Sequence, residues 1–139
     1  MRQLQHQLSV NGHGRGMTDI TREIRQWVSA SGIKTGLLNL FVRHTSCSLM
    51  IQENADPDVL LDVEAFMSRL VPDGDPIFRH RAEGPDDMPA HIRMAITQVS
   101  LNIPVAGGRL VLGTWQGVYL YEHRLHPMNR CIQLHLLGE

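Results

Sequence analysis

The segment from Phe78 to Arg93, which reads FRHRAEGPDDMPAHIR, carries the residues best suited to chemistry in this chain. It gathers His80 and His91 around the carboxylates of Asp86 and Asp87. A neutral imidazole binds a metal ion through one ring nitrogen while the other nitrogen donates a hydrogen bond. The segment begins as a loop with proline and glycine and ends as the start of a helix. We therefore predict a metal-binding or anion-binding site here.

A third histidine, His44, ends an apolar strand in the sequence LLNLFVRHTSCS. Three histidines with one open position form the ligand set of some catalytic zinc sites. We predict that His44, His80 and His91 are metal ligands, although their spacing matches no compact zinc motif such as HExxH. Asp87 is a candidate catalytic carboxylate. Asp86 and Asp87 also suit the N-terminal cap of the following helix, which is the alternative role for both.

Polar residues on either side of the apolar strand 47–52 are further catalytic candidates. Cys47 lies three residues after His44, so it is either the nucleophile of a cysteine–histidine pair or a small buried residue. Glu53 lies between this strand and the next helix, where it is either a general base or an ordinary surface glutamate. Asn54, which follows it, is a candidate for substrate binding.

Two residues in the last third of the chain are candidates for substrate binding. Arg130 begins the last strand, and its planar guanidinium suits a substrate phosphate; a surface arginine is the alternative. Trp115, in the sequence GTWQG, either packs in the core or forms the wall of a pocket. The histidines therefore have two possible partners, a metal ion or a phosphate, and the sequence leaves both open.

The composition limits the class of protein. A chain of 139 residues with 42% hydrophobic residues predicts one domain, residues 1–139, with an ordinary core. A net charge of −1 argues against a nucleic-acid partner. No apolar run approaches the ~20 residues of a membrane span, and the first ten residues lack the apolar core of a signal peptide. With only two cysteines, we expect a cytoplasmic protein with reduced thiols and no membrane partner.

Hydrophobic periodicity and turn residues predict an α+β domain with mainly antiparallel sheet and about three helices. The helices are predicted over residues 18–30, 57–70 and 89–98, with a long loop over residues 71–86. The strands are predicted over residues 4–10, 36–42, 47–52, 100–105, 109–112, 118–123 and 130–137. In the second and third helices, two apolar stripes are expected to face the core: Leu60, Val63, Met67 and Leu70; and Ile92, Ala95, Ile96 and Val99.

As a set, these motifs resemble the YjbQ family, also called UPF0047. The resemblance rests on HTSCSLMIQENADP (44–57), HRAEGPDDMPAHIR (80–93) and IPVAGGRLVLGTWQGVYLYEHR (103–124), in this order over nearly the whole chain. It implies an antiparallel α+β fold that assembles as a homotrimer. The family's site pattern falls on these residues: His44, His80, His91, Glu53, Asp56, Asp62, Asp87 and Arg130. His123, in the EHR triplet, ranks behind the three histidines as a ligand.

The resemblance also implies a weak, secondary thiamine-phosphate synthase activity, which joins a pyrimidine diphosphate to a thiazole phosphate and releases pyrophosphate. We therefore expect a small enzyme that acts on phosphorylated small molecules. Loss of pyrophosphate requires charge stabilisation by a divalent metal or by arginines. Histidines suit zinc, whereas magnesium prefers oxygen ligands and would bind through the substrate phosphates. The alternatives are a trimeric metal- or ligand-binding module and a metal-assisted hydrolase of unknown substrate.

Overall fold

The computed structural model describes residues 1–139 as eight strands and three helices. The helices are α1 (Thr21–Ser31), α2 (Pro57–Leu70) and α3 (Asp87–Ile96). The strands are β1 (Arg2–Asn11), β2 (Gly16–Asp19), β3 (Thr35–Val42), β4 (Cys47–Glu53), β5 (Ser100–Ala106), β6 (Arg109–Leu110), β7 (Gln116–Glu122) and β8 (Asn129–Gly138). The expected α+β class with three helices is confirmed. The short strand β2 was not predicted, because its residues were assigned to a loop and a helix start.

The strands form two antiparallel sheets. The larger has the order β1-β8-β3-β5-β6 and the smaller the order β2-β7-β4. In the smaller sheet, the start of β4 lies beside the end of β7, where Cys47 pairs with Glu122. The other end of β4 pairs Glu53 with Gln116. The two ends of β4 therefore carry different groups of the predicted site residues.

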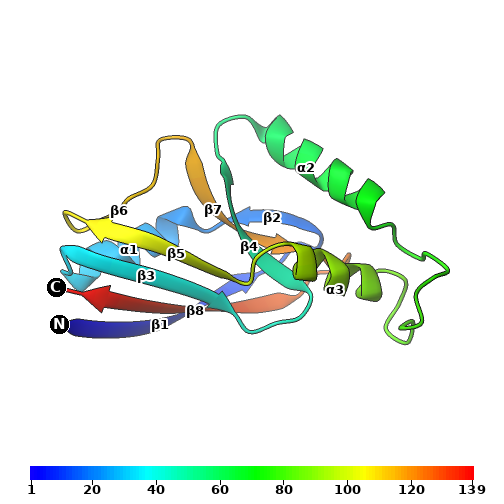
Figure 1. Ribbon diagram of the computed structural model, residues 1–139, viewed down its shortest axis with the longest axis horizontal. Coiled ribbons are helices and arrows are strands. Elements are labelled where there is room, and N and C mark those ends of the chain that lie inside the picture. The colour runs from blue at the N-terminus through cyan, green and yellow to red at the C-terminus, as the bar shows by residue number, and fades with distance from the viewer.

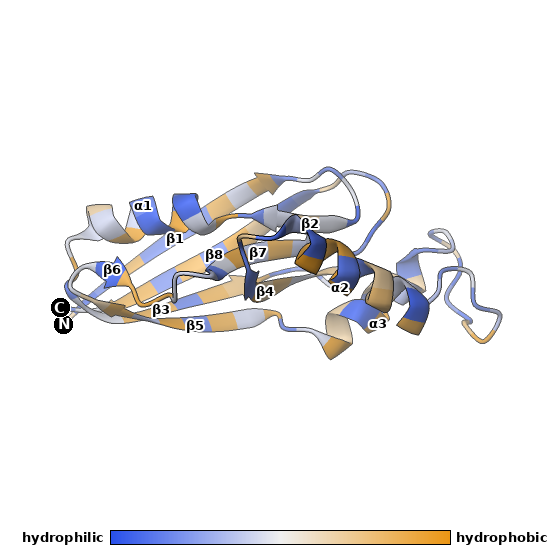
Figure 2. Ribbon diagram, turned by 90° about the horizontal axis from the view of Figure 1, so that it is seen from above, coloured by the Kyte–Doolittle hydropathy of each residue, from blue (hydrophilic) through white to orange (hydrophobic).

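The core lies where alternate residues of the strands point inward, as expected for antiparallel strands with one buried face. β8 shows this pattern most clearly, because Ile132, Leu134 and Leu136 are all buried. α1 lies along the sheets (Figure 2) and adds Ile24 and Val28 to the same cluster. None of the three helices is both long and apolar enough to cross a membrane.

α2, α3 and the loop over residues 71–86 lie at the end of the molecule opposite the two chain termini (Figure 1). The predicted start of α2 is confirmed: Asp56 accepts a hydrogen bond from the backbone N–H of Asp58, and Pro57 is the first helical residue. The predicted inner stripe of α2 is only partly correct. Met67 is buried, but Leu70 is 56% exposed.

The predicted inner stripe of α3 is only partly correct: Val99 packs against the core, but Ile96 is 53% exposed, while Ala90 and Arg93 are buried. The reason is an ion pair. The Arg93 guanidinium, 0% exposed, donates to the carboxylate of Glu64 on α2 at 2.8 and 3.1 Å. Its other terminal nitrogen donates to Ser68 at 3.1 Å. This ion pair joins α3 to α2 and accounts for the burial of the charged Arg93 side chain.

Candidate metal centre

His80, Asp87 and His91 lie together, and one ligand atom from each falls within 4.8 Å of the others. The Oδ2 atom of Asp87 is 2.6 Å from His80 Nε2 and 3.3 Å from His91 Nε2. His80 comes from the long loop, whereas Asp87 and His91 are four residues apart on α3 and share a face of that helix. The two imidazoles remain 45% and 30% exposed, but Asp87 is buried. Two imidazoles and a carboxylate form a donor set that suits zinc.

The orientation of His91 is set by a backbone carbonyl. Its Nδ1 atom lies 2.6 Å from the carbonyl oxygen of Thr45, in the connection between β3 and β4. A carbonyl oxygen only accepts hydrogen bonds, so Nδ1 is the donor. In the neutral ring, Nε2 then carries a lone pair that faces the Asp87 carboxylate. Two such acceptors repel each other unless the ring gains a proton or a cation lies between them.

The carboxylate of Asp87 is held from its other side by Arg124. The Oδ1 atom forms an ion pair with Arg124 Nη1 at 2.9 Å, and Arg124 Nε donates to Asp86 Oδ2, also at 2.9 Å. Burial opposes ionisation of Asp87, but the hydrogen bond from His80 and the charges of His91 and Arg124 lower its pKa. The predicted capping role of Asp86 is wrong, because its side chain makes no cap hydrogen bond and instead binds Arg124.

His44 lies outside this group within the chain. Its Nε2 atom accepts a hydrogen bond from the backbone N–H of Cys131 at 2.9 Å, so that nitrogen is already engaged. Burial and the charge of Arg130 lower the pKa of His44, which favours the neutral ring. The structure therefore joins two of the three predicted histidine ligands, His80 and His91, with Asp87 in place of His44.

The structure does not support a nucleophilic role for Cys47. Its side chain is fully buried in the core, and burial raises the pKa of the thiol to about 12. The thiolate is the nucleophilic form of cysteine, and neutral pH cannot generate it here. The alternative assignment, a small buried residue, is the one that the structure favours.

Arg130 forms a buried ion pair with Glu122, so neither sequence interpretation describes it. Its Nε and Nη2 atoms donate to the two carboxylate oxygens of Glu122 at 2.7 and 2.6 Å. The same Nη2 donates to Ser46 Oγ at 2.8 Å. The guanidinium fork that was expected to bind a substrate phosphate is thus occupied by a carboxylate, and the side chain is not on the surface.

Glu53, Asn54 and Trp115 lie together at the other end of β4. Glu53 is six positions from Cys47, which is about 20 Å along an extended strand. Glu53 accepts hydrogen bonds from the backbone N–H groups of residues 55 and 56 at 3.0 and 2.8 Å, just before α2. Asn54 donates its backbone N–H to the carbonyl of Trp115 at 3.1 Å, while the indole is 64% exposed. These contacts stabilise the connection from β4 to α2 and the connection from β6 to β7. They do not bring the three residues to the histidine pair.

The sequence comparisons place the chain among known proteins. The family model described as "UPF0047 protein YjbQ-like" matches residues 6–139. The chain belongs to the YjbQ-like family. It is 52% identical to the UPF0047 protein sll1880 of Synechocystis over 99% of this chain and 94% of that protein. It is 45% identical to the UPF0047 protein YjbQ of Salmonella typhimurium, over 97% and 98% of the two chains.

Solved structures share the fold of this YjbQ-like chain. The conserved hypothetical protein TT1486 from Thermus thermophilus has a TM-score of 0.82 and 38% identity, covering 95% of this chain and 99% of that one. The hypothetical protein APE1520 from Aeropyrum pernix has a TM-score of 0.89 and 33% identity, covering 98% and 99%. The resemblance seen in the motifs is therefore a shared fold as well as a shared sequence.

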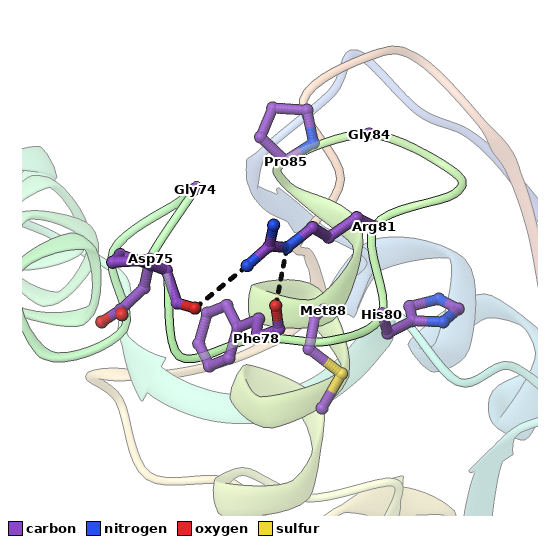
Figure 3. Close-up of a pocket in the computed structure, with 9 residues that line it drawn as sticks. Gly74, Asp75, Phe78, His80, Arg81, Gly84, Pro85 and Met88 are labelled. Carbon is purple, nitrogen blue, oxygen red and sulfur yellow. Dashed lines mark hydrogen bonds between the residues drawn. The ribbon is translucent and has the colours of Figure 1, made fainter.

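A pocket of about 370 Å³ adjoins His80 in this YjbQ-like chain. Figure 3 shows Phe78 and Met88 on one side of it and Arg81 above them, while the imidazole of His80 points away from Arg81. Arg81 donates to the carbonyl oxygens of Phe78 and Pro76 at 2.7 and 3.0 Å, which ties the loop together. This volume lies at the lower end of ligand pockets, ~300–1,000 Å³, and His80 is the only one of the three candidate ligands that lines it.

His123 ranked behind the three predicted histidine ligands, and Arg124 was not predicted as a site residue. Both follow β7 in the EHR triplet, and a charged run after a buried strand predicts side chains that are exposed to solvent. Both are buried instead. His123 Nε2 lies 2.9 Å from Ser48 Oγ, and burial together with the charge of Arg93 lowers the pKa of His123 to about 3. The presence of the triplet in the family motif was the one signal that could have drawn attention to them.

Proposed function

We propose that this protein is a metal-dependent enzyme that acts on small phosphorylated molecules, with a zinc ion held by His80, Asp87 and His91. The observation that carries the proposal is the geometry of His91. Its Nδ1 donates to a backbone carbonyl, and its Nε2 faces a carboxylate. Histidines that bind metals typically donate their second ring N–H to a carbonyl or carboxylate in this way.

The same geometry argues against direct phosphate binding by the imidazoles. If His91 were doubly protonated, its two N–H groups would point at Thr45 and Asp87, leaving no donor for a phosphate. The carboxylate of Asp87 would also repel a phosphate placed between the two rings. A cation satisfies all three side chains at once, since each offers it an electron pair.

Zinc suits this donor set better than magnesium does, because magnesium prefers oxygen ligands in an octahedral arrangement. Three protein ligands leave one position open, as in catalytic zinc sites. A zinc ion bound here would act as a Lewis acid toward a phosphoryl oxygen. The exposed edges of His80 and His91 would give a small substrate access to that position.

The reaction we propose to assay first is thiamine-phosphate synthesis, which rests on the family resemblance. A metal-assisted hydrolase of small phosphate esters is the second candidate. One observation favours it: two imidazoles and a carboxylate with an open position suit zinc hydrolysis more than a magnesium-dependent loss of pyrophosphate. A metal-binding module without catalysis is the third alternative.

Metal analysis of purified protein tests the site. After loading with zinc and removal of excess, we expect one zinc per chain in the wild type. His80→Ala and His91→Ala should each lose it, while His135→Ala, a histidine on β8 outside the group, should keep it. If the folded wild type retains no zinc, the metal proposal is wrong, because the three side chains would then be present without affinity for zinc.

Activity assays on the same variants test the enzyme. Thiamine-phosphate formation and the hydrolysis of small phosphate esters should both be measured in zinc-loaded wild type. Activity that requires the site should fall by at least two orders of magnitude in His80→Ala and stay unchanged in His135→Ala. Turnover that survives in His80→Ala would show that the metal site serves something other than that reaction.

We further propose that the protein is a cytoplasmic homotrimer. The family resemblance suggests the trimer, and α2 agrees with self-association, because Phe66 and Leu70, which are four residues apart and share a helical face, are 63% and 56% exposed. Large apolar side chains exposed together are typical of interaction surfaces. Two free cysteines agree with a reducing compartment. Light scattering should give three times the chain mass, and Phe66→Glu should lower it; a monomeric wild type would contradict the trimer.

A further inference from the structure

Arg124 contacts three separate points of the segment that carries the candidate metal centre. Its Nη1 atom pairs with Asp87 Oδ1, its Nε donates to Asp86 Oδ2, and its Nη2 donates to the carbonyl of Glu83, each at 2.9 Å. The backbone N–H of Leu125 adds a further hydrogen bond to Asp86 Oδ2 at 3.0 Å. One buried arginine therefore fixes both the end of the long loop and the first residue of α3.

The two oxygens of Asp87 consequently have different surroundings. Oδ1 faces the guanidinium of Arg124, while Oδ2 faces both imidazoles. Asp87 is only 2% exposed, so its carboxylate has little room to rotate. A cation between His80 and His91 would meet Oδ2 alone, because Oδ1 is held on the opposite side.

The position of Arg124 is in turn fixed by Arg130 through Glu122. The Oε2 atom of Glu122 accepts hydrogen bonds from the backbone N–H groups of His123 and Arg124 at 3.0 and 3.2 Å. Nε and Nη2 of Arg130 both donate hydrogen bonds to the same carboxylate. This chain of contacts begins at the start of β8, passes through the end of β7 and ends at Asp87 on α3.

Resting on the proposed zinc site, we propose that Arg124 is a positioning residue that makes Asp87 a one-oxygen ligand. Arg130 supports Arg124 through Glu122 and does not itself contact the substrate. A carboxylate that binds through one oxygen keeps the coordination number low, as tetrahedral zinc sites require. If Asp87 bound through both oxygens, it would fill the position that a substrate needs.

The test compares Arg124→Met with wild type by zinc affinity, measured against a chelator, and by the visible spectrum of the cobalt-substituted protein. Loss of a side chain that orients a metal ligand weakens metal binding about 10- to 100-fold, and we expect that range here. The intense visible band of four-coordinate cobalt should also weaken, because a freed Asp87 can add its second oxygen. Arg124→Lys keeps the positive charge but cannot make all three contacts. Its zinc affinity should therefore fall between those of the wild type and Arg124→Met.

The matched control is Arg93→Met. Arg93 is another buried arginine paired with a carboxylate, but its partner is Glu64 and it touches none of the candidate ligands. We expect it to lower stability and to leave zinc affinity and the cobalt band unchanged. If Arg124→Met does not fold, Arg124→Lys carries the comparison.

Three results bear on the proposal in different ways. If every folded Arg124 variant keeps the zinc affinity and the cobalt spectrum of the wild type, the positioning role of Arg124 is overturned, while the proposed metal site stands. Equal weakening in Arg93→Met and Arg124→Met would also overturn it, since the effect would then be general loosening. A wild type that binds no zinc would remove the proposed function, and this inference with it.

Discussion

His123 should make the protein sensitive to acid. Burial and the charges of neighbouring arginines lower its pKa to about 3, so it stays neutral in the folded state where an unfolded histidine takes up a proton. Stability is therefore lost as the pH falls below the ordinary histidine value of about 6.5. At about 1.4 kcal/mol per pH unit, this residue alone removes about 4 kcal/mol of unfolding free energy between about pH 6 and about pH 3.

The variant His123→Gln tests this magnitude, because glutamine can still bond Ser48 but does not titrate. At pH 7 we expect it to be less stable by ~1–2 kcal/mol, since it packs less well than the imidazole against Tyr121, whose ring centroid is 4.4 Å away. The wild type loses about 1.4 kcal/mol per pH unit below about pH 6.5, so the two proteins should reach equal stability between about pH 5 and about pH 6.

Urea unfolding of metal-free protein at a fixed concentration, from pH 7 down to about pH 4, measures the difference directly. Other groups with shifted pKa values titrate in both proteins and cancel. His126→Gln, in an exposed turn, is the control and should run parallel to the wild type. Parallel curves for His123→Gln and wild type would refute the reasoning, because they would mean that His123 takes up its proton in the folded state at its ordinary pKa.

Three further changes probe the residues around the site. Native protein should react quickly with one equivalent of a thiol reagent, at half-buried Cys131, because the pKa of buried Cys47 is raised to about 12; two fast thiols per chain would contradict this. Asp56→Ala removes the cap of α2 and should lower the unfolding free energy by ~1 kcal/mol, with zinc affinity unchanged. Trp115→Ala, at an exposed position, should change the unfolding free energy by less than ~0.5 kcal/mol, and a loss of zinc affinity would place it at the site after all.

Local signals were sufficient for much of the fold. Alternating residues identified β8, the Asp56-Pro57 pair located the start of α2, and Gly107-Gly108 marked the hairpin between β5 and β6. The hairpin needs both glycines because their φ angles are +58° and +77°, which side chains disfavour. Each of these signals depends only on residues that are neighbours in the sequence, so it can be recognised without knowledge of contacts between distant residues.

The site required information that local patterns do not contain. His80 and His91 were found from residue type, but their grouping with Asp87 was not, because the helix was predicted to begin at residue 89, whereas α3 begins at Asp87 and so puts Asp87 and His91 on a common face. Within the chain, His44 lies apart from the other two histidines, and its Nε2 accepts a hydrogen bond from the backbone of Cys131, a residue 87 positions away. No pattern in the sequence indicates which distant backbone group a histidine will meet.

Buried charge is the common cause of the remaining errors. Sequence patterns assign arginine to the surface, yet Arg93, Arg124 and Arg130 are 0%, 8% and 3% exposed. Each is paired with a carboxylate in another segment, and the two partners are 29, 38 and 8 positions apart, respectively. Ion pairs of this kind add little net stability, but breaking one leaves a buried charge at a cost of about 3–5 kcal/mol. Their effect is therefore on arrangement: Arg93 joins α3 to α2, and Arg124 holds one oxygen of Asp87 so that the other meets the histidines.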